Sequence, residues 1–360
     1  MHLYYHDVND AFAELVVGIH SGSIPTVRSA SRNGDVLVVE EPVIITYRYP
    51  RQRVLFNAAR DCNPFFHLFE SLWMLAGRND ITPLVYYNPR MAEYSDDGKT
   101  MHGAYGHRWR CCERSFYQES FDQVREIVHQ LSVESTSRRC VLSMWIPLED
   151  LWKITKDKPC NTHVYFAVDD GRCLDMTVCN RSNDLIWGML GANMVHMSLL
   201  QEYMACCIGV KVGRYHQMTN NMHVYVDKWD PDKWLESSTH RTIHSPPLIN
   251  YGSRVRVGPF LVEKPERFDR ECKAFVESID GTFGEPFLRD VAQPMMAAFR
   301  AHKQRKYVGD LNAFTLIDRV HAEDWRIVGK QWLTKRQKAW NDRSCNPYTD
   351  REGERQEKGM

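Results

Sequence analysis

Several features are missing from this 360-residue sequence, and each absence excludes a class of protein. No run of about eighteen apolar residues occurs, so no membrane-spanning helix is expected. The first residues, MHLYYHDVND, lack the charged start and apolar stretch of a secretory signal. Net charge is also lacking, because 46 basic residues balance 46 acidic ones. We therefore expect a cytoplasmic protein that does not bind nucleic acid or membranes through its overall charge.

Metal-ligand spacing is absent as well. The eleven cysteines contain no CxxC pair, and the fifteen histidines show no ligand pattern. Cys206 and Cys207 lie inside an apolar segment, which favours reduced thiols in a core over disulfides. The sequence predicts no metal site.

The chain is long enough for one large domain with an appendage, since 43% of its residues are hydrophobic and 26% are charged. Amphipathic stripes indicate a helical extension over 251–344, and the polar residues 345–360 are expected to be disordered. Residues 1–250 mix helical and strand-like patterns, so the fold class is α+β.

Four patterns within residues 1–250 place candidate residues on helices and strands. The stretch 64–77 has apolar side chains at helical spacing, with Glu70 among them, and 121–132 forms a second stripe that leads into the strand-like CVLSMWI. Alternation over 162–168 and 173–179 predicts a hairpin, and 192–208 predicts a buried helix closed by a glycine.

Two residues have unusual surroundings. Cys160 lies in a polar break between apolar segments, unlike the other cysteines, and a nucleophilic thiol needs a nearby cation to lower its pKa. Glu70 lies among apolar side chains, where a carboxylate with a raised pKa suits proton transfer. A core thiol and a solvent-facing carboxylate are the alternatives.

Guanidinium and amide groups suggest a site for a nucleotide. Arg138-Arg139 and Arg181-Ser182 flank strands and could bind phosphate, although surface charges often have this pattern. The amide of Asn193, just before the buried helix, could pair with the edge of a pyrimidine or cap the helix.

From about residue 28 to 250 the sequence resembles thymidylate synthases and their nucleotide hydroxymethylase relatives. The motifs that carry the resemblance are, in chain order, Glu70 in FESLWMLAG, Tyr105 in AYGHRWR, Arg138-Arg139 in SRRCVLSMW, Cys160 in PCN, Arg181, Ser182 and Asp184 in RSND, Asn193 before its helix, and His223 and Tyr225 in MHVY. The resemblance implies a catalytic domain over 1–250 with a large mixed β-sheet at a homodimer interface and flanking helices. The implied co-substrate is 5,10-methylenetetrahydrofolate, and the implied substrate is a pyrimidine nucleoside monophosphate.

The resemblance also implies a role for each matching residue. Cys160 would add to C6 of the base, Glu70 would organise proton transfers, and Tyr105 would assist removal of the C5 proton, with Asp184 as a further catalytic residue. The implied substrate-binding residues are Arg32, Arg181 and Ser182 together with the partner subunit's Arg138 and Arg139 for the phosphate, His223 and Tyr225 for the sugar, and Asn193 and Asn161 near the base.

Departures from the family pattern bear on the reaction. Asn161 replaces the histidine of the usual PCH, and Gly191-Ala192 replaces the usual proline and phenylalanine before Asn193. Met91 aligns with an indole that shields the reactive methylene in a synthase, and the synthase's C-terminal tail is not recognisable. Loss of the shield would admit water, so the departures favour a hydroxymethyl product over methyl.

The identity of the base depends on Asn193. An aspartate there marks the phage deoxycytidylate hydroxymethylases, but an asparagine amide can flip and read either base. Because GAN and PCN look like cytidylate hydroxymethylases, we predict hydroxymethylation of CMP or dCMP. The alternatives are a dUMP hydroxymethylase, a methylating enzyme (thymidylate synthase or dCMP methyltransferase), and an inactive nucleotide- or RNA-binding relative. If the chain is phage-encoded, its compartment would be the host cytoplasm.

Overall fold

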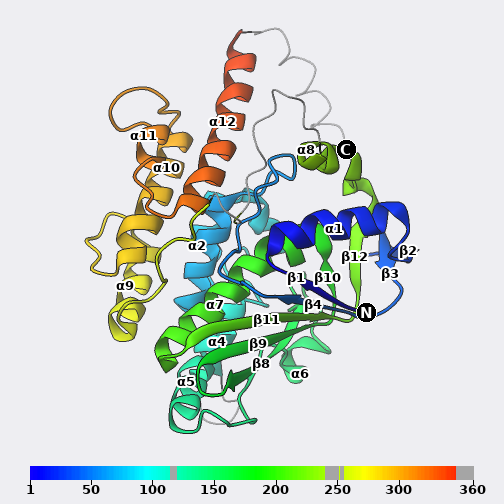
Figure 1. The fold of residues 1–360 in the computed structure, drawn as a ribbon. Coiled ribbons are helices and arrows are strands. Elements are labelled where there is room, and N and C mark those ends of the chain that lie inside the picture. Colours follow the sequence, from blue (N-terminus) through cyan, green and yellow to red (C-terminus); the bar gives the residue numbers. More distant parts are fainter. Residues whose placement is uncertain (114–119, 240–250, 252–254, 346–360) are drawn as a thin grey trace.

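A computed structural model of the chain describes residues 1–113, 120–239, 251 and 255–345 (Figure 1). At its centre lies a six-stranded mixed sheet. In sheet order its strands are β1 His2–Tyr5, β4 Val43–Tyr47, β11 Lys211–Thr219, β9 Cys173–Asn180, β8 Asn161–Asp169 and β7 Val141–Ser143. The pairs β1–β4 and β11–β9 are parallel and the others antiparallel, and β8–β9 confirms the predicted hairpin. The strand predicted from CVLSMWI is shorter, since β7 covers three residues.

Two smaller sheets complete the strands. The four-stranded sheet has the order β10 Asn183–Asp184, β12 Met222–Tyr225, β3 Gly34–Val39 and β2 Thr26–Ser31, and the two-stranded one joins β5 Cys112–Glu113 to β6 Ser120–Phe121. The four-stranded sheet carries several site residues.

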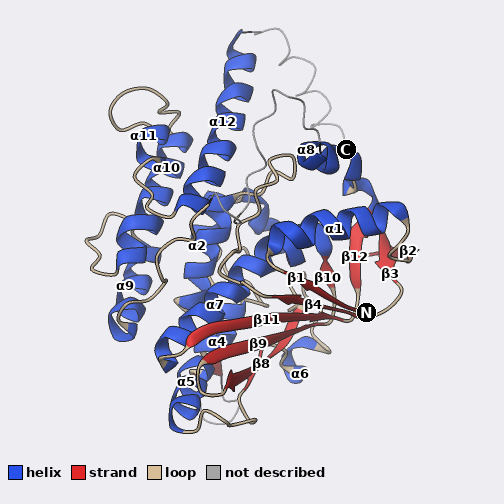
Figure 2. Cartoon of the chain, viewed as in Figure 1, coloured by secondary structure: helices blue, strands red, loops and turns tan. Residues whose placement is uncertain are grey.

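Helices cover one face of the large sheet (Figure 2). Those preceding the extension are α1 Val8–Ser21, α2 Pro64–Leu75, α3 Thr82–Tyr87, η1 Pro89–Tyr94, α4 Tyr105–Arg110, α5 Gln123–Val133, α6 Pro147–Asp150, the π-helix η2 Leu185–Ala192, α7 Asn193–Ile208, η3 Val226–Lys228 and α8 Pro231–Thr239. The helices predicted at 64–77, 121–132 and 192–208 are therefore confirmed as α2, α5 and α7, within a few residues at their ends.

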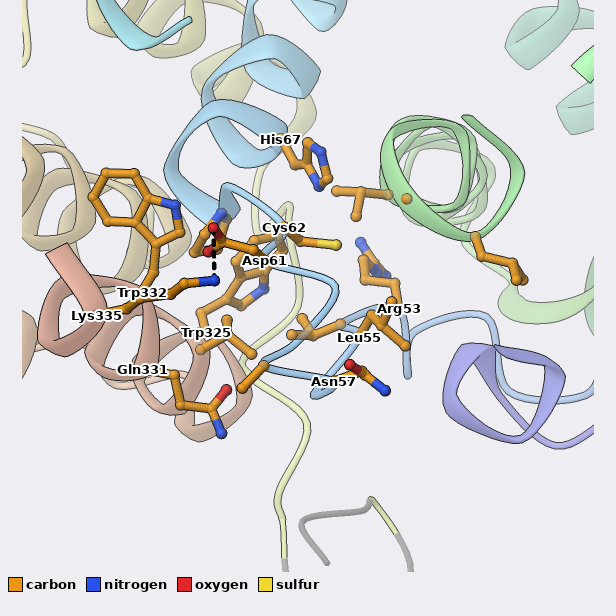
Figure 3. Close-up of a pocket in the computed structure, with 17 residues that line it drawn as sticks. Arg53, Leu55, Asn57, Asp61, Cys62, His67, Trp325, Gln331, Trp332 and Lys335 are labelled. Atoms are coloured by element: carbon orange, nitrogen blue, oxygen red, sulfur yellow. Dashed lines mark ion pairs between the residues drawn. The ribbon is translucent and has the colours of Figure 1, made fainter. Parts of the chain in front are cut away.

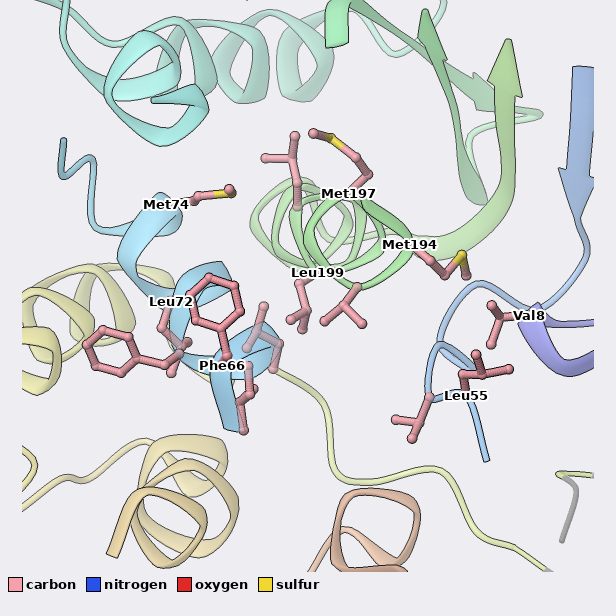
Figure 4. Packing of buried hydrophobic residues seen from close by; sticks show 14 of the residues in the cluster. Val8, Leu55, Phe66, Leu72, Met74, Met194, Met197 and Leu199 are labelled. Carbon is pink, nitrogen blue, oxygen red and sulfur yellow. The ribbon is translucent and has the colours of Figure 1, made fainter. Parts of the chain in front are cut away.

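The core is built where α2 and α7 meet (Figure 4). Side chains of α2 such as Leu72 face side chains of α7 such as Leu199, and both are at most 1% exposed. α7 is buried along most of its length and ends at Gly209, whose φ of 83° lies in the left-handed region that glycine adopts without strain. A helix that is apolar on nearly every side can only be stable inside the fold.

The opposite face of the large sheet exposes several large apolar side chains. Strand register places Tyr4, Val141, Tyr165 and Met218 on this face, and each of them is 38% or more exposed. Several large apolar side chains exposed on one sheet face are typical of an interaction surface.

The helical extension, residues 265–345, packs against α2 (Figure 1). It consists of α9 Pro265–Glu277, the π-helix η4 Leu288–Ala292, α10 Gln293–Lys303, α11 Ala313–Ile317 and α12 Glu323–Cys345. The predicted stripe on α9 is buried at Phe268, Cys272, Phe275 and Val276. Of the tail predicted to be disordered, all but Cys345 lies outside the described residues.

Candidate active site

Cys160 and Arg181 are brought together by the β8–β9 hairpin. Cys160 immediately precedes β8 and Arg181 immediately follows β9, so antiparallel pairing sets them opposite each other, and Arg181 N donates to Cys160 O at 2.9 Å. The guanidinium donates to Pro159 O at 2.8 Å and lies 3.7 Å from Cys160 Sγ. A shift in register between Asn161 and His163 bends the start of β8, a feature common beside active sites.

The protonation of Cys160 is set by opposing effects. Burial raises the pKa of its thiol, and Arg181 and Arg32 oppose this rise while Asp157 adds to it. In the isolated subunit the thiol is therefore the favoured form. Further positive charge or hydrogen bonds near Sγ are needed to shift it to the thiolate.

Tyr105 holds the backbone that carries the nucleophile. Its hydroxyl oxygen accepts hydrogen bonds from Cys160 N at 3.0 Å and Asn161 N at 3.2 Å. Burial, with the charge on Cys160, raises the pKa of Tyr105. Behind it, Gly106 lies so close to α2 that a Cβ there would come within 2.1 Å of Met74 O. Only glycine permits this approach, which fixes α4 against the helix that bears Glu70.

Glu70 is buried, so the solvent-facing alternative for this residue is wrong. It is 7% exposed on α2, and its Oε2 lies 3.0 Å from Nε2 of His196 on α7. His67, one turn before Glu70, has its ring centroid 6.4 Å from that of His196. Burial, reinforced by the charges of His196 and Arg60, holds the pKa of His67 well below its usual range. His67 is thus a neutral imidazole near neutral pH.

Asn161 is fully buried at the start of β8. Its Oδ1 accepts a hydrogen bond from Asn180 Nδ2, and its own Nδ2 has no partner in the described part of the chain. An unpaired buried amide is costly unless a ligand completes it. This group is therefore available to a bound ligand.

The π-helix η2 arranges three polar side chains. Asp184 caps it, accepting from Trp187 N at 2.5 Å, and burial raises the pKa of Asp184 despite that bond. Asn193 follows η2, is 8% exposed, and donates from Nδ2 to Oδ1 of Asn183 at 3.0 Å. Single-turn π-helices are frequent at functional sites.

His223 and Tyr225 lie on β12 in the four-stranded sheet. Their rings meet edge to face with centroids 5.4 Å apart, and His223 contributes to the electrostatic environment of Asp184. Arg32 lies in the turn between β2 and β3, and its neighbour Asn33 donates to Tyr225 Oη at 3.5 Å. This sheet thus brings Arg32, His223 and Tyr225 to the region of Cys160 and Asp184.

Some predicted residues are not brought into this cluster by their own subunit. Arg138 and Arg139 are exposed just before β7, where Arg139 pairs with Glu134 at 2.8 Å. Neither has a contact with Cys160 or Arg181 among the described residues. Ser182, half-buried, follows Arg181 in the chain and lies beside the cluster.

Sequence reasoning missed two groups at the site. His196 lies within an apolar helical stretch, where a single histidine gives no functional signal. Arg60 stacks on Trp187, with its Cζ 3.8 Å from the ring centroid, and donates to Ile186 O at 3.0 Å. The one available signal for Arg60 is a cation placed just before the predicted helix of Glu70.

A cleft of about 80 Å³ lies between His67 of α2 and the helical extension (Figure 3). It is lined by the loop preceding α2, by His67 and Gly191, and by the α12 side chains Trp325, Val328, Gln331, Trp332 and Lys335. At its rim Asp61 pairs with Lys335, 3.0 Å apart, and with Arg336. We call it the α12 cleft.

The chemistry of this cluster follows from its parts. A cysteine beside a guanidinium can add to an electron-poor ring, and a tyrosine with a buried carboxylate and imidazole can move the protons that such an addition requires. The fold and the site are therefore those of an enzyme with a candidate cysteine nucleophile.

Comparison with known proteins identifies the family. The family model for thymidylate synthase matches residues 56–256. The chain is 43% identical over 334 residues to a deoxyuridylate hydroxymethyltransferase of Pseudomonas phage M6, an alignment that covers 91% of this chain and 93% of the relative. It is 40% identical over 227 residues to the protein of the same name from Bacillus phage SP01, covering 58% and 59%. A thymidylate synthase of Symbiobacterium thermophilum is 32% identical over 169 residues, covering 43% and 57%.

The chain belongs to the thymidylate synthase family. It is an enzyme that transfers a one-carbon unit from methylenetetrahydrofolate to C5 of a pyrimidine nucleoside monophosphate, as predicted. In the part of the chain that the structure describes, no helix is long and apolar enough to cross a membrane. Within the same residues, no group of three or more His, Cys, Asp or Glu side chains is arranged to hold a metal ion.

Proposed function

We propose that this enzyme hydroxymethylates dUMP at C5. The observation that carries the choice of uracil is the amide of Asn193. Because Asn193 Nδ2 donates to Asn183, its oxygen is left to accept a hydrogen bond from the ring, and N3 of uracil bears a hydrogen whereas N3 of cytosine does not. The names of the phage relatives support the same substrate.

CMP or dCMP, the substrate predicted from the sequence, is the second candidate. The Gly191-Ala192-Asn193 and Pro159-Cys160-Asn161 patterns favour it, and the unpaired Nδ2 of Asn161 could donate to a ring acceptor. Cytosine needs the NH₂ of Asn193 turned toward N3. Reading cytosine would therefore require that amide to leave Asn183, which makes it the weaker candidate.

In the proposed reaction each side chain has one task. Cys160 adds to C6 of the base, which makes C5 nucleophilic, and Tyr105 assists removal of the C5 proton. Methylenetetrahydrofolate, when bound, supplies the one-carbon unit. Arg181, Ser182 and Arg32 bind the phosphate, and His223 and Tyr225 bind the sugar hydroxyl.

A water molecule rather than a hydride completes the reaction in this proposal. Met91, on η1, is half-buried against the core, and it occupies the aligned position of the synthase indole. A flexible thioether covers less area than an indole, so water can reach the exocyclic carbon. Addition of water leaves the folate reduced.

The α12 cleft is our candidate site for the folate. His67 joins it to Glu70, and its aromatic and apolar wall suits a flat ring system. Lys335 and Arg336 at its rim suit the carboxylates of a glutamyl tail. The helical extension would then supply part of the co-substrate site.

A homodimer completes the phosphate site in this proposal. The sheet face that exposes Tyr4, Val141, Tyr165 and Met218 is the candidate interface. A two-fold pair of such faces would bring Arg138 of the partner subunit and Arg139 of the partner subunit toward the other protomer's site. Mixing the inactive variants Cys160→Ala and Arg139→Ala should restore part of the activity through mixed dimers. No recovery in dimers that exchange subunits would contradict this arrangement.

One experiment tests the reaction and the base together. The enzyme is incubated with methylenetetrahydrofolate and dUMP, dCMP or CMP separately, and the product is weighed while dihydrofolate absorbance is followed. Hydroxymethylation adds about 30 Da without dihydrofolate, and methylation adds about 14 Da with it. We expect the first result with dUMP. A methylated product, or turnover of a cytosine nucleotide alone, would overturn the proposal.

Two variants sharpen this test. Asn193→Asp should move the preference from dUMP toward dCMP, because its carboxyl group no longer reproduces the amide's pairing. Met91→Trp should raise the share of methylated product, because an indole would exclude water. An unchanged product ratio in Met91→Trp would remove the shielding argument.

A further inference from the structure

The buried pair formed by Glu70 and His196 joins the two helices that carry the site. Asn193 and His196 are one turn apart on α7, and His67 and Glu70 are one turn apart on α2. Residues three apart in a helix share a face. The base-reading amide, the imidazole and the carboxylate therefore lie next to one another where α2 meets α7.

His196 is buried with both ring nitrogens unsatisfied by the described residues. It is 4% exposed, and apart from its 3.0 Å approach to Glu70 neither ring nitrogen makes a well-directed hydrogen bond to any described residue. A buried imidazole without partners is costly, so retaining one here calls for a ligand or a proton to complete it. The second buried imidazole, that of His67, is held neutral by burial and by the neighbouring charges.

Asn161 stands where the family pattern has a histidine, so the site needs another group that can accept a proton. Where PCH would place an imidazole beside the base, Asn161 has an amide, which cannot take up a proton at neutral pH. Among the described residues, His196 supplies the buried imidazole that contacts Glu70.

We propose that His196 is a positioning residue that accepts, through Glu70, the proton released when water adds to the exocyclic carbon. This rests on the proposed hydroxymethylation. The water oxygen bonds to the exocyclic methylene carbon, and the electron pair of the exocyclic C=C bond moves into the ring. That pair forms the C5=C6 bond and expels the Cys160 thiolate from C6. The O–H bond of water breaks, and its proton passes to the Glu70 carboxylate and on to His196 Nε2.

The assignment separates two steps of the reaction. Loss of the C5 proton, which Tyr105 assists, precedes the water step and does not need His196. A variant that keeps a hydrogen-bond donor at this position but cannot accept a proton should therefore slow only the later step. His196→Gln meets both conditions, because its amide can still face Glu70.

The test is a single-turnover reaction of the full chain with dUMP tritiated at C5 and methylenetetrahydrofolate. For His196→Gln we expect tritium release within about threefold of wild type and formation of 5-hydroxymethyl-dUMP slowed about 100-fold, the size of a general acid–base contribution. The nucleotide should accumulate as an adduct on Cys160, visible in the mass of the intact protein. Equal slowing of both steps, or no slowing of either, would overturn the proposal.

Two further measurements guard the interpretation. His302→Gln, which removes a half-buried imidazole of α10, should leave both rates unchanged. If His196→Gln folds poorly, His196→Ala with added imidazole replaces it: recovery of product formation supports the proposal, and absence of recovery counts against it. If wild type itself forms a methylated product, the proposed function has failed. If wild type hydroxymethylates and the two steps stay coupled in the variant, only the role of His196 has failed.

Discussion

Two buried carboxylates on neighbouring helices, Glu70 of α2 and Glu202 of α7, have very different surroundings. Glu202 is 2% exposed, pairs with Arg51 at 3.0 Å and with Arg53, and accepts from Leu261 N at 3.1 Å. Glu70 is 7% exposed, and its ion-pair partner among the described residues is His196. Two guanidinium groups fix a permanent charge, whereas an imidazole allows the charge to move.

The comparison shows that burial alone does not identify a catalytic carboxylate. Glu202 ties the loop before α2 and the chain near Leu261 to α7. His67, one turn before Glu70, lines the α12 cleft, and the imidazole that faces Glu70 can exchange a proton. The difference predicts that removing the charge of Glu70 lowers activity, whereas removing the charge of Glu202 lowers stability.

The largest effect is expected for Glu70→Gln. The carboxamide keeps the shape but cannot carry a proton, so product formation should fall by about 100- to 10,000-fold. The thermal unfolding midpoint should stay close to that of wild type, because no buried arginine is left unpaired. Turnover of dUMP measures the loss of activity, and calorimetry measures the unfolding midpoint. A large loss of stability would place Glu70 in the same class as Glu202.

Glu202→Gln should have the opposite effect. Breaking a buried ion pair by removing one partner costs about 3–5 kcal/mol, because Arg53 would remain buried without a counter-charge. Denaturant unfolding should report this loss, while turnover per folded molecule remains near wild type. A fall in turnover at unchanged stability would contradict the structural assignment.

A third buried carboxylate, Asp324 at the start of α12, extends the comparison. It accepts from Tyr251 Oη at 3.0 Å and from Trp325 N at 2.9 Å, and burial raises its pKa to about 6. The folded chain holds the proton of Asp324 more tightly than the unfolded chain does. Protonated Asp324 therefore stabilises the fold below about pH 4, and this contribution is lost as the pH rises through 6.

Asp324→Asn should therefore stabilise the protein at pH 7.5 by up to about 3 kcal/mol and have little effect at pH 4. Chemical unfolding at the two pH values measures the difference. An equal change at both values would show that Asp324 is not protonated on folding.

The smallest effect is expected for Asp61→Asn at the rim of the α12 cleft. Asp61 is partly exposed, and its φ of 57° suits asparagine as well as aspartate. Water screens its pairs with Lys335 and Arg336, so the free energy of unfolding should change by less than about 1 kcal/mol. A loss as large as that of Glu202→Gln would contradict the ranking.

Local sequence patterns predicted the elements that carry the site. Apolar spacing gave α2 and α7, and alternation gave the β8–β9 hairpin that sets Cys160 opposite Arg181. These patterns are sufficient because each element buries a face that its own sequence defines. The roles of individual residues came from the order of motifs rather than from spacing.

Contacts between distant segments could not be predicted in this way. The pairing of β1 with β4 and the π-helix η2 leave no local pattern, and η2 reads in sequence as a loop before a helix. His196 looked like any polar residue in a buried helix, since its partner lies on α2. Arg60 and Trp187 are far apart in the chain, and only the folded protein stacks them.

The α12 cleft has a consequence for inhibitor design. Its inner wall, at His67 and Gly191, lies within the segment that matches the family model, and its outer wall, at Trp325 and Trp332, lies outside it. A small molecule that fills the cleft would contact both walls at once. The outer wall therefore offers selectivity that no compound fitted to the shared domain alone can exploit, and ligands built against Trp325 and Trp332 could use this difference.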